Sequence, residues 1–474
     1  MGPIQLPSPD HRVARLADSA DSSHLDALKR YRSDAVSFQA LKTGARWWID
    51  AAAPEGTGAV VAYVPSGRSW IAIGSPLIDD ALRQAAARRF CTAARAHGRR
   101  AVFFGVEDRT PHGLGRSLIL GLQSVLKPSQ WDSTLRQRPR LREQLRRARA
   151  KKVTVREVEA RELAEGMPMR AAVERLRKEW LGSRAMEPLG FLVAVDPFYA
   201  ADEHLYFVAE RGGKAVQFLS AVPIYARHGW LMEDMLRGVD APNGTTELLI
   251  DALKRRLGDD PSWLTPGLTP LAGVAGVIPP WLRIIRFATV ALYDFSGLWR
   301  FRARLQPSAW TPVWLVWDRG FAPLVLFDVL RAFAGGRIVS FALRSLVWHP
   351  NGPPWAVAVP LVAWTVLLAG LVAAGETALL GYSRITLGAW VAFDVVLAWL
   401  LFKAARKPRP RRLIAVATIA SFDAVVSVRH LAAIGVGAGA IAWICRTIAT
   451  AGPVIGTIAL LWAAWRARRP VPRA

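Results

Sequence analysis

The chain has 474 residues, enough for more than one domain with its own core. Its formal net charge of +25 favours anionic partners, either nucleic acid or the acidic face of a membrane, although arginine-rich coding and basic membrane loops also raise this charge. The two cysteines, Cys91 and Cys445, exclude a disulfide framework, and the eight histidines lack metal-ligand spacing, so we expect no metal site.

Residues 1–30 are expected to form an N-terminal extension, and because they lack an apolar segment we expect no cleaved signal peptide. The region 31–137 then alternates short strands with a helix. Two β-rich runs around a Pro-Ser-Gly-Arg turn over 58–78 predict a hairpin, Asp79–Gly98 predicts a helix, and residues 100–108 predict a buried strand. This order indicates a small α/β unit.

The region 138–318 opens with a basic run, Arg138–Lys152, that has eight basic residues and one glutamate. As a helix it would turn Leu141 and Leu145 inward, and its basic residues form either an ordinary solvated face or a phosphate-binding surface. The candidates for contact with phosphate are Arg142, Arg146, Arg147, Arg149, Lys151 and Lys152.

The same order of elements then recurs. Residues 204–225 predict a hairpin with a Gly-Gly turn, 229–236 a strand, and 245–258 a helix. The repeat indicates two copies of one unit. Asp234 and Arg237 are three residues apart on the strand, and therefore face opposite sides unless the strand bulges. They are either an ion pair at a strand edge or site residues.

The remaining sequence is more apolar. Residues 319–350 predict an amphipathic helix at the lipid surface, with Val325, Leu326, Val329, Leu330 and Phe333 at helical spacing. The region 351–474 predicts a transmembrane domain of about four spans, with 431–445 as either a re-entrant piece or a fifth span. The basic loop over 403–412 is expected in the cytoplasm, which places the N-terminal region there as well.

No phosphate-binding loop, dinucleotide fingerprint or nucleophile elbow is present, and no cofactor is expected. The chain nevertheless resembles the catalytic domain of the phosphatidylglycerol lysyltransferase (multiple peptide resistance factor) family over roughly 32–317. The resemblance rests on eight segments in order: SFQALK, AIGSPLID, RRFCTAARAHGRRAVFFGVED, LREQLRRARAKKVTV, KEWLGSR…EPLGF, LMEDMLRGVDAPNGTTELLIDAL, LTPGLTPLAGV and YDFSGLWRFRARLQPSAWTPVWLVW.

The resemblance implies an α/β fold of tandem GNAT-like acyltransferase units, here followed by an α-helical transmembrane domain. It implies catalytic roles for Asp234, Arg237 and Arg302. It also implies substrate-binding roles for the residues Glu233, Asn243, Gly244 and Thr269. Thr311 and Trp314 stand where the family has an acid and a tyrosine, which leaves the donated amino acid open. The catalytic-domain-first order favours an anchoring role for the membrane domain.

The implied function is an aminoacyltransferase of a bacterial inner membrane. It would move an amino acid from aminoacyl-tRNA to an anionic lipid such as phosphatidylglycerol, without metal or cofactor. Two alternatives remain open. One is an acyltransferase that uses acyl-CoA or acyl carrier protein on an amino-lipid, and the other is a lipid transport or sensing protein with a degenerate acyltransferase module.

Overall fold

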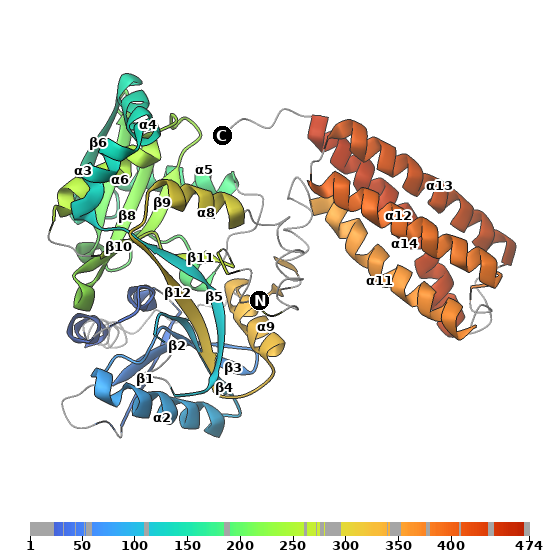
Figure 1. Cartoon of the computed structure of the whole chain (residues 1–474), viewed down its shortest axis with the longest axis horizontal. Coiled ribbons are helices and arrows are strands. Elements are labelled where there is room, and N and C mark those ends of the chain that lie inside the picture. Colours follow the sequence, from blue (N-terminus) through green and yellow to red (C-terminus); the bar gives the residue numbers. More distant parts are fainter. Residues whose placement is uncertain are drawn as a thin grey trace, which may run out of the picture.

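The computed structural model shows an α/β region and a separate bundle of long helices (Figure 1). It describes residues 23–468 except for positions 32, 43, 52, 54–58, 109–112, 184–189, 260–262, 272, 275–278, 280–294, 339, 342–351, 376–379, 407–408 and 435–439.

Within these residues a seven-stranded sheet has the order β1-β2-β3-β4-β12-β5-β11. Its strands are β1 (Arg46–Ile49), β2 (Val60–Ser66), β3 (Ser69–Ile73), β4 (Arg100–Val106), β5 (Arg116–Val125), β11 (Leu268–Pro270) and β12 (Ala309–Trp317). The helix α2 (Arg83–Ala96) packs Ala87, Phe90 and Ala94 on one face, and α9 (Ala322–Phe333) packs Val325 and Val329 on the other.

The second sheet has the order β10-β9-β8-β7-β6 among the described residues. Its strands are β6 (Val153–Val158), β7 (Leu205–Arg211), β8 (Lys214–Ile224), β9 (Gly229–Arg237) and β10 (Trp263–Thr265). One face is covered by α4 (Pro139–Ala150) and α6 (Thr245–Leu257), and the other by α5 (Pro168–Gly182). Leu141 and Leu145 of α4 are buried, as their spacing predicts.

Both sheets contain the repeated unit predicted from the sequence. In the first, β2 and β3 are antiparallel, α2 follows, and β4 lies parallel to β3. In the second, β8 and β9 are antiparallel, α6 follows, and β10 lies parallel to β9. This antiparallel-then-parallel arrangement around one helix confirms the expected pair of GNAT-like α/β units.

Two strands lie far from their sheet partners in sequence. β11 and β12 fall in the region 138–318, yet β11 pairs with β5, and β12 lies between β4 and β5. Between them in the chain comes α8 (Phe295–Arg304), and α3 (Trp131–Gln137) leads from β5 towards α4. The first sheet is therefore completed by residues that follow the whole second sheet.

Four helices in the described part of the membrane half are long and apolar enough to cross a membrane. They are α11 (Gly352–Ala374), α12 (Arg384–Arg406), α13 (Pro410–Ile434) and α14 (Ala440–Arg468). The segment 431–445 is divided between the end of α13 and the start of α14, and its middle lies outside the described residues. It is thus not a separate helix in the described chain.

Candidate active site

The strand β9 bulges at its two neighbouring acids. Across β8 and β9, Leu219 is opposite Met235 and Ala221 is opposite Met232, so the two residues Glu233 and Asp234 face a single partner residue. Two residues against one is the pattern of a β-bulge, which redirects side chains away from strict alternation. The structure therefore contains the bulge that the sequence left as an alternative.

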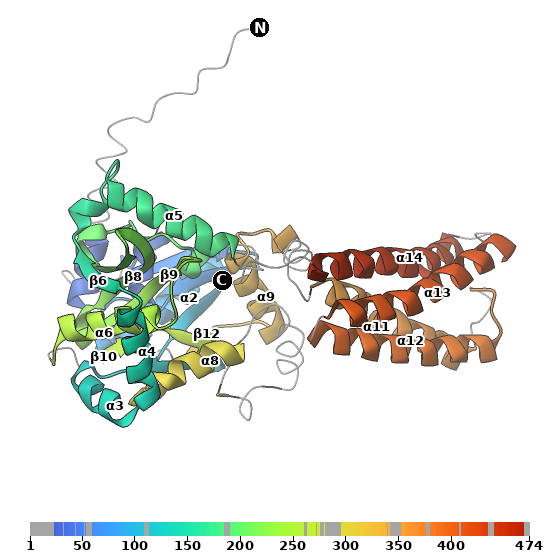
Figure 2. The same ribbon diagram turned by 90° about the horizontal axis from the view of Figure 1, so that it is seen from above.

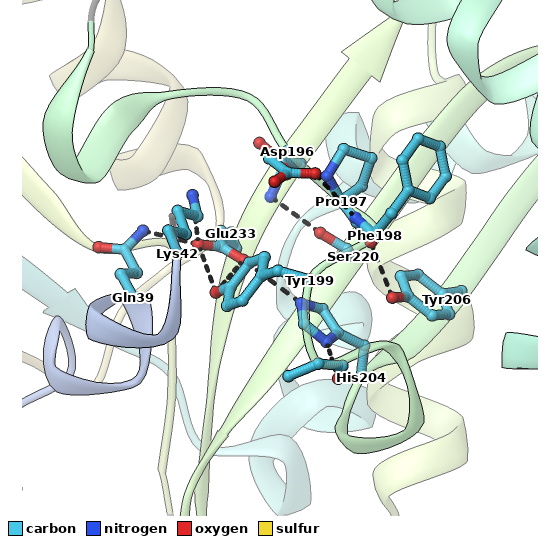
Figure 3. A network of polar contacts seen from close by, with 12 residues as sticks. Gln39, Lys42, Asp196, Pro197, Phe198, Tyr199, His204, Tyr206, Ser220 and Glu233 are labelled. Carbon is cyan, nitrogen blue, oxygen red and sulfur yellow. Dashed lines mark hydrogen bonds and ion pairs between the residues drawn. The ribbon is translucent and has the colours of Figure 1, made fainter. Parts of the chain in front are cut away.

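Glu233 is the centre of a buried polar cluster (Figure 3). Lys42 Nζ lies 2.8 Å from its Oε1, Gln39 Nε2 donates to Oε1 at 2.9 Å, and Tyr199 OH lies 2.9 Å from both carboxylate oxygens. His204 Nε2 lies 3.6 Å from Oε2. Burial alone would raise the pKa of Glu233, but His204 and Lys42 outweigh it and hold the pKa below its ordinary value.

The pKa of Asp234 is shifted in the opposite direction to that of Glu233. Its side chain is buried, its backbone N–H donates to Ser220 Oγ at 3.2 Å, and its Oδ2 has no hydrogen-bond partner among the described residues. Burial and the neighbouring charge of Glu233 raise its pKa from 3.8 to about 7. Adjacent acids whose environments separate their pKa values in this way are a recurrent arrangement in acid–base catalysis.

Arg237 lies at the end of β9 and holds the following turn. Its Nη2 donates to Ala241 O at 2.9 Å and to Asn243 Oδ1 at 3.3 Å. Gly244 has a φ of +93°, and a Cβ there would lie 2.1 Å from a backbone oxygen of α4. Among the described residues, no ion pair joins Arg237 to Asp234. These residues fix the turn before α6 against the basic helix.

Arg302 and Thr269 form another group. Arg302, on α8, donates from Nη1 to Thr269 Oγ1 at 2.6 Å and to Gly267 O at 2.5 Å, and its Nη2 donates to Pro266 O. Thr269 is completely buried on β11. Arg302 thus fixes the turn that carries the chain from the second sheet into the first.

The basic helix α4 has both structural and exposed cations. Arg142 Nη1 donates to Leu135 O at 2.9 Å, at the end of α3, and Arg149 Nη2 lies 2.9 Å from the buried Asp251 Oδ2. These two contacts anchor the helix to its neighbours.

Further cations project from the surface of α4. Arg146 and Arg147 both pair with the single acid of the run, Glu143, at 2.7 Å. Lys151 and Lys152 follow and are exposed. One carboxylate cannot neutralise this group, so the surface stays positive.

A cavity of about 370 Å³ lies beside the acid cluster. Gln39 and Lys42, which contact Glu233, line one part of it, whereas Val64, Ile73 and Phe191 contribute an apolar wall. Its lining extends to the C-terminal end of α9 through the residues Arg331, Ala332, Gly335 and Gly336. The cavity can therefore receive a ligand with both polar and apolar parts.

Sequence reasoning missed Gln39, Lys42, Tyr199 and His204 as members of this cluster. Two of them, Gln39 and Lys42, belong to the segment SFQALK, which resembles the family but carries no motif that indicates a role for either residue. Tyr199 and His204 precede β7 and carry no recognisable motif. Both lie in the same unit as Glu233, whereas Gln39 and Lys42 join the cluster only because the two units pack against each other.

The two repeated units, with the polar cluster between them, define a tandem GNAT-like α/β fold. Residues 26–317 match the model of the family "Phosphatidylglycerol lysyltransferase, C-terminal". The chain belongs to this family, which confirms the resemblance seen in the sequence.

Comparison with individual proteins agrees with this assignment. The phosphatidylglycerol lysyltransferase of Bacillus subtilis (strain 168) is 30% identical over 151 residues, which are 29% of this chain and 16% of that protein. The chain therefore matches about a sixth of the length of this relative.

Two solved structures have the same fold. The C-terminal domain of a putative lysylphosphatidylglycerol synthetase from Agrobacterium fabrum is 21% identical, with a TM-score of 0.57 over 68% of this chain and 98% of that one. The L-PGS structure from Bacillus licheniformis is 19% identical, with a TM-score of 0.58 over 66% and 96%.

Proposed function

We propose that this chain transfers an amino acid from aminoacyl-tRNA to the headgroup of an anionic lipid such as phosphatidylglycerol. Family membership supports the reaction class. The observation that carries the proposal is the Glu233–Asp234 bulge. It sets a carboxyl with a pKa of about 7, that of Asp234, next to Glu233, whose partners Gln39 and Lys42 line a cavity that is both polar and apolar.

The chemistry requires a nucleophile, a proton acceptor and a leaving group. The lipid hydroxyl oxygen bonds to the carbonyl carbon of the aminoacyl ester, and the bond from that carbon to the ribose oxygen of tRNA breaks. Asp234 accepts the hydroxyl proton and returns it to the departing ribose oxygen. A pKa near neutrality suits both halves of this cycle. The ester is already activated, so the reaction needs neither ATP nor metal.

The other site residues are proposed to bind and position. Glu233, held by Lys42, orients the polar end of the substrates. Arg237 with Asn243 and Gly244, and Arg302 with Thr269, fix the turns on either side of the site. The donated amino acid stays open between lysine, alanine and others.

The exposed cations of α4 are proposed to contact tRNA phosphates. Lys151→Ala should weaken tRNA binding and lower the slope of log K against log salt by about one for each lost contact. Binding to the full chain in detergent, measured at several salt concentrations, checks this. The exposed Arg161, on a different segment, provides the control. An unchanged slope would exclude Lys151 from the tRNA surface.

The protein is proposed to lie in the bacterial inner membrane, with its α/β region on the cytoplasmic side where tRNA is available. The four apolar helices support membrane insertion, and the basic loop between α12 and α13 supports this orientation.

The test is lipid extraction and mass spectrometry from cells that express the chain. We expect an aminoacylated lipid, and an approximately hundredfold decrease with Asp234→Asn, because general-base catalysis contributes factors of this order. The matched control is Asp240→Asn, an exposed acid paired with Lys214. Absence of any aminoacylated lipid would refute the proposal, and an acylated lipid without an amino acid would point to the acyl-CoA or acyl-carrier alternative. Labelled aminoacyl-tRNAs supplied singly then identify the donor.

A further inference from the structure

The helix α9 has apolar residues on two opposite faces. Val325 and Val329 are 0% and 2% exposed in the core of the first sheet, so they do not face lipid as the sequence pattern alone suggested. On the outward face Leu324, Phe327 and Leu330 are 56%, 47% and 44% exposed. We call these three residues the outer stripe. Their spacing of three aligns them along one side of the helix.

The outer stripe is held in place from inside. Asp328 of α9 is buried and accepts hydrogen bonds from Ser69 Oγ at 2.6 Å and Arg100 Nη2 at 2.7 Å. Its backbone oxygen accepts another from Ser66 Oγ at 2.8 Å. Rotating α9 to cover the stripe would expose this carboxylate and break all three bonds, so the stripe faces outward permanently.

The position of α9 indicates what covers the stripe. In both views α9 lies on the side of the α/β region nearest to the bundle of apolar helices (Figures 1 and 2). It is the last helix of more than ten residues before α11 in the described chain, and the exposed Arg331 and Arg337 lie beside the stripe and just beyond it. Exposed aliphatic and aromatic side chains beside arginines are the composition of a segment that lies in the headgroup region of an anionic bilayer.

The same helix lines the cavity beside the acid cluster. Arg331, Ala332, Gly335 and Gly336 line the end of the cavity that α9 forms, and Lys42 lines the same cavity. We propose that the outer stripe docks the α/β region onto the bilayer and turns this end of the cavity towards lipid, so that a lipid headgroup enters past Arg331. The identity of the acceptor rests on the proposed function, whereas the docking does not.

Docking is tested by spin-label accessibility on the full chain in nanodiscs of phosphatidylcholine and phosphatidylglycerol. Cys91 and Cys445 are first replaced by serine, and a label is attached at Leu324→Cys. The control is Arg88→Cys, exposed on α2 across the same sheet. We expect the label at 324 to be reached by oxygen but shielded from a water-soluble nickel chelate. Equal chelate accessibility at both sites would overturn the proposal.

A second measurement separates docking from catalysis. The variant Leu324→Glu/Phe327→Glu changes exposed side chains only. We expect it to lower transfer to bilayer phosphatidylglycerol about tenfold. Leu324 and Phe327 are each about half exposed, so together they lose roughly the burial of one large apolar side chain. Transfer to monomeric dihexanoyl-phosphatidylglycerol should be unchanged. Equal loss on both acceptors would overturn the proposal. If the unsubstituted protein modifies neither lipid, the proposed function fails while the spin-label result still decides the docking.

Discussion

The buried carboxyl of Asp234 should lower the stability of the folded protein at neutral pH. Its pKa is raised from 3.8 to about 7, so the folded state favours the neutral carboxyl. Between these two pH values the folded chain holds a proton that the unfolded chain has lost, and the free energy of unfolding therefore falls as pH rises. The full cost, present above pH 7, is at most roughly 4 kcal/mol.

The substitution Asp234→Asn removes this cost. An amide cannot ionise, so the variant should gain stability relative to the parent as pH rises from 5 to 8, by roughly 2.5 kcal/mol. The amide N–H groups also lack partners at this buried position, which costs about 1–3 kcal/mol. That penalty is the same at pH 5 and at pH 8. It therefore cancels when the difference in stability between variant and parent at pH 8 is compared with the difference at pH 5.

The assay is hydrogen exchange of the full chain in detergent, followed by mass spectrometry of peptides from β8 and β9. Parent and variant are compared at the same pH, which removes the pH dependence of the intrinsic exchange rate. We expect protection of these strands to increase in the variant at pH 8 relative to pH 5. A parent-to-variant difference that is the same at both pH values would refute the raised pKa and, with it, the assignment of Asp234 as the proton acceptor.

Two further substitutions test the architecture around the site. Lys42→Met leaves the buried carboxylate of Glu233 without its cation and should lower the free energy of unfolding by about 3–5 kcal/mol, measured by denaturant titration. Gly67→Ala places a Cβ 1.9 Å from Asp328 Oδ1 at a φ of +54°, and should cost roughly 3 kcal/mol in the same titration.

Each has a matched control. Lys29→Met removes an exposed pair with Glu203 and should cost under about 1 kcal/mol. Gly98→Ala has a similar φ of +67° but open space around the new Cβ, so about 1 kcal/mol is expected. A loss of stability at Lys42 or Gly67 no larger than at its control would contradict the contacts described.

The sequence was sufficient to predict the local elements and the family. The helix over 79–98, the buried strand that follows it and the inward leucines of α4 depend on local periodicity, which a single sequence displays directly. Asp234 was predicted to be a site residue because its segment resembles the corresponding segment of the family. Its raised pKa was not predictable, since it arises from burial and from the bulge beside Glu233.

Contacts between residues far apart in the sequence could not be predicted. Lys42 and Glu233 are far apart in sequence, and only the packing of the two units brings them to 2.8 Å. The pattern on α9 was recognised as amphipathic, but periodicity cannot tell which apolar face meets a sheet and which is left exposed. Arg302 was expected among the catalytic residues. In the structure its guanidinium group donates hydrogen bonds to the backbone of the turn before β11.

The placement of β12 has a consequence for how the protein is made. β4 and β5 follow one another in the chain, yet β12, at Ala309–Trp317, lies between them. A ribosome must therefore synthesise the entire second sheet before the first can close. Until then the edges of β4 and β5 that pair with β12 stay unpaired, and unpaired strand edges favour aggregation. Folding is also slow because it depends on contacts between residues far apart in the sequence. We therefore expect the chain to depend on chaperones during its synthesis and membrane insertion. For the same reason, fragments that end near residue 137 should fail to fold.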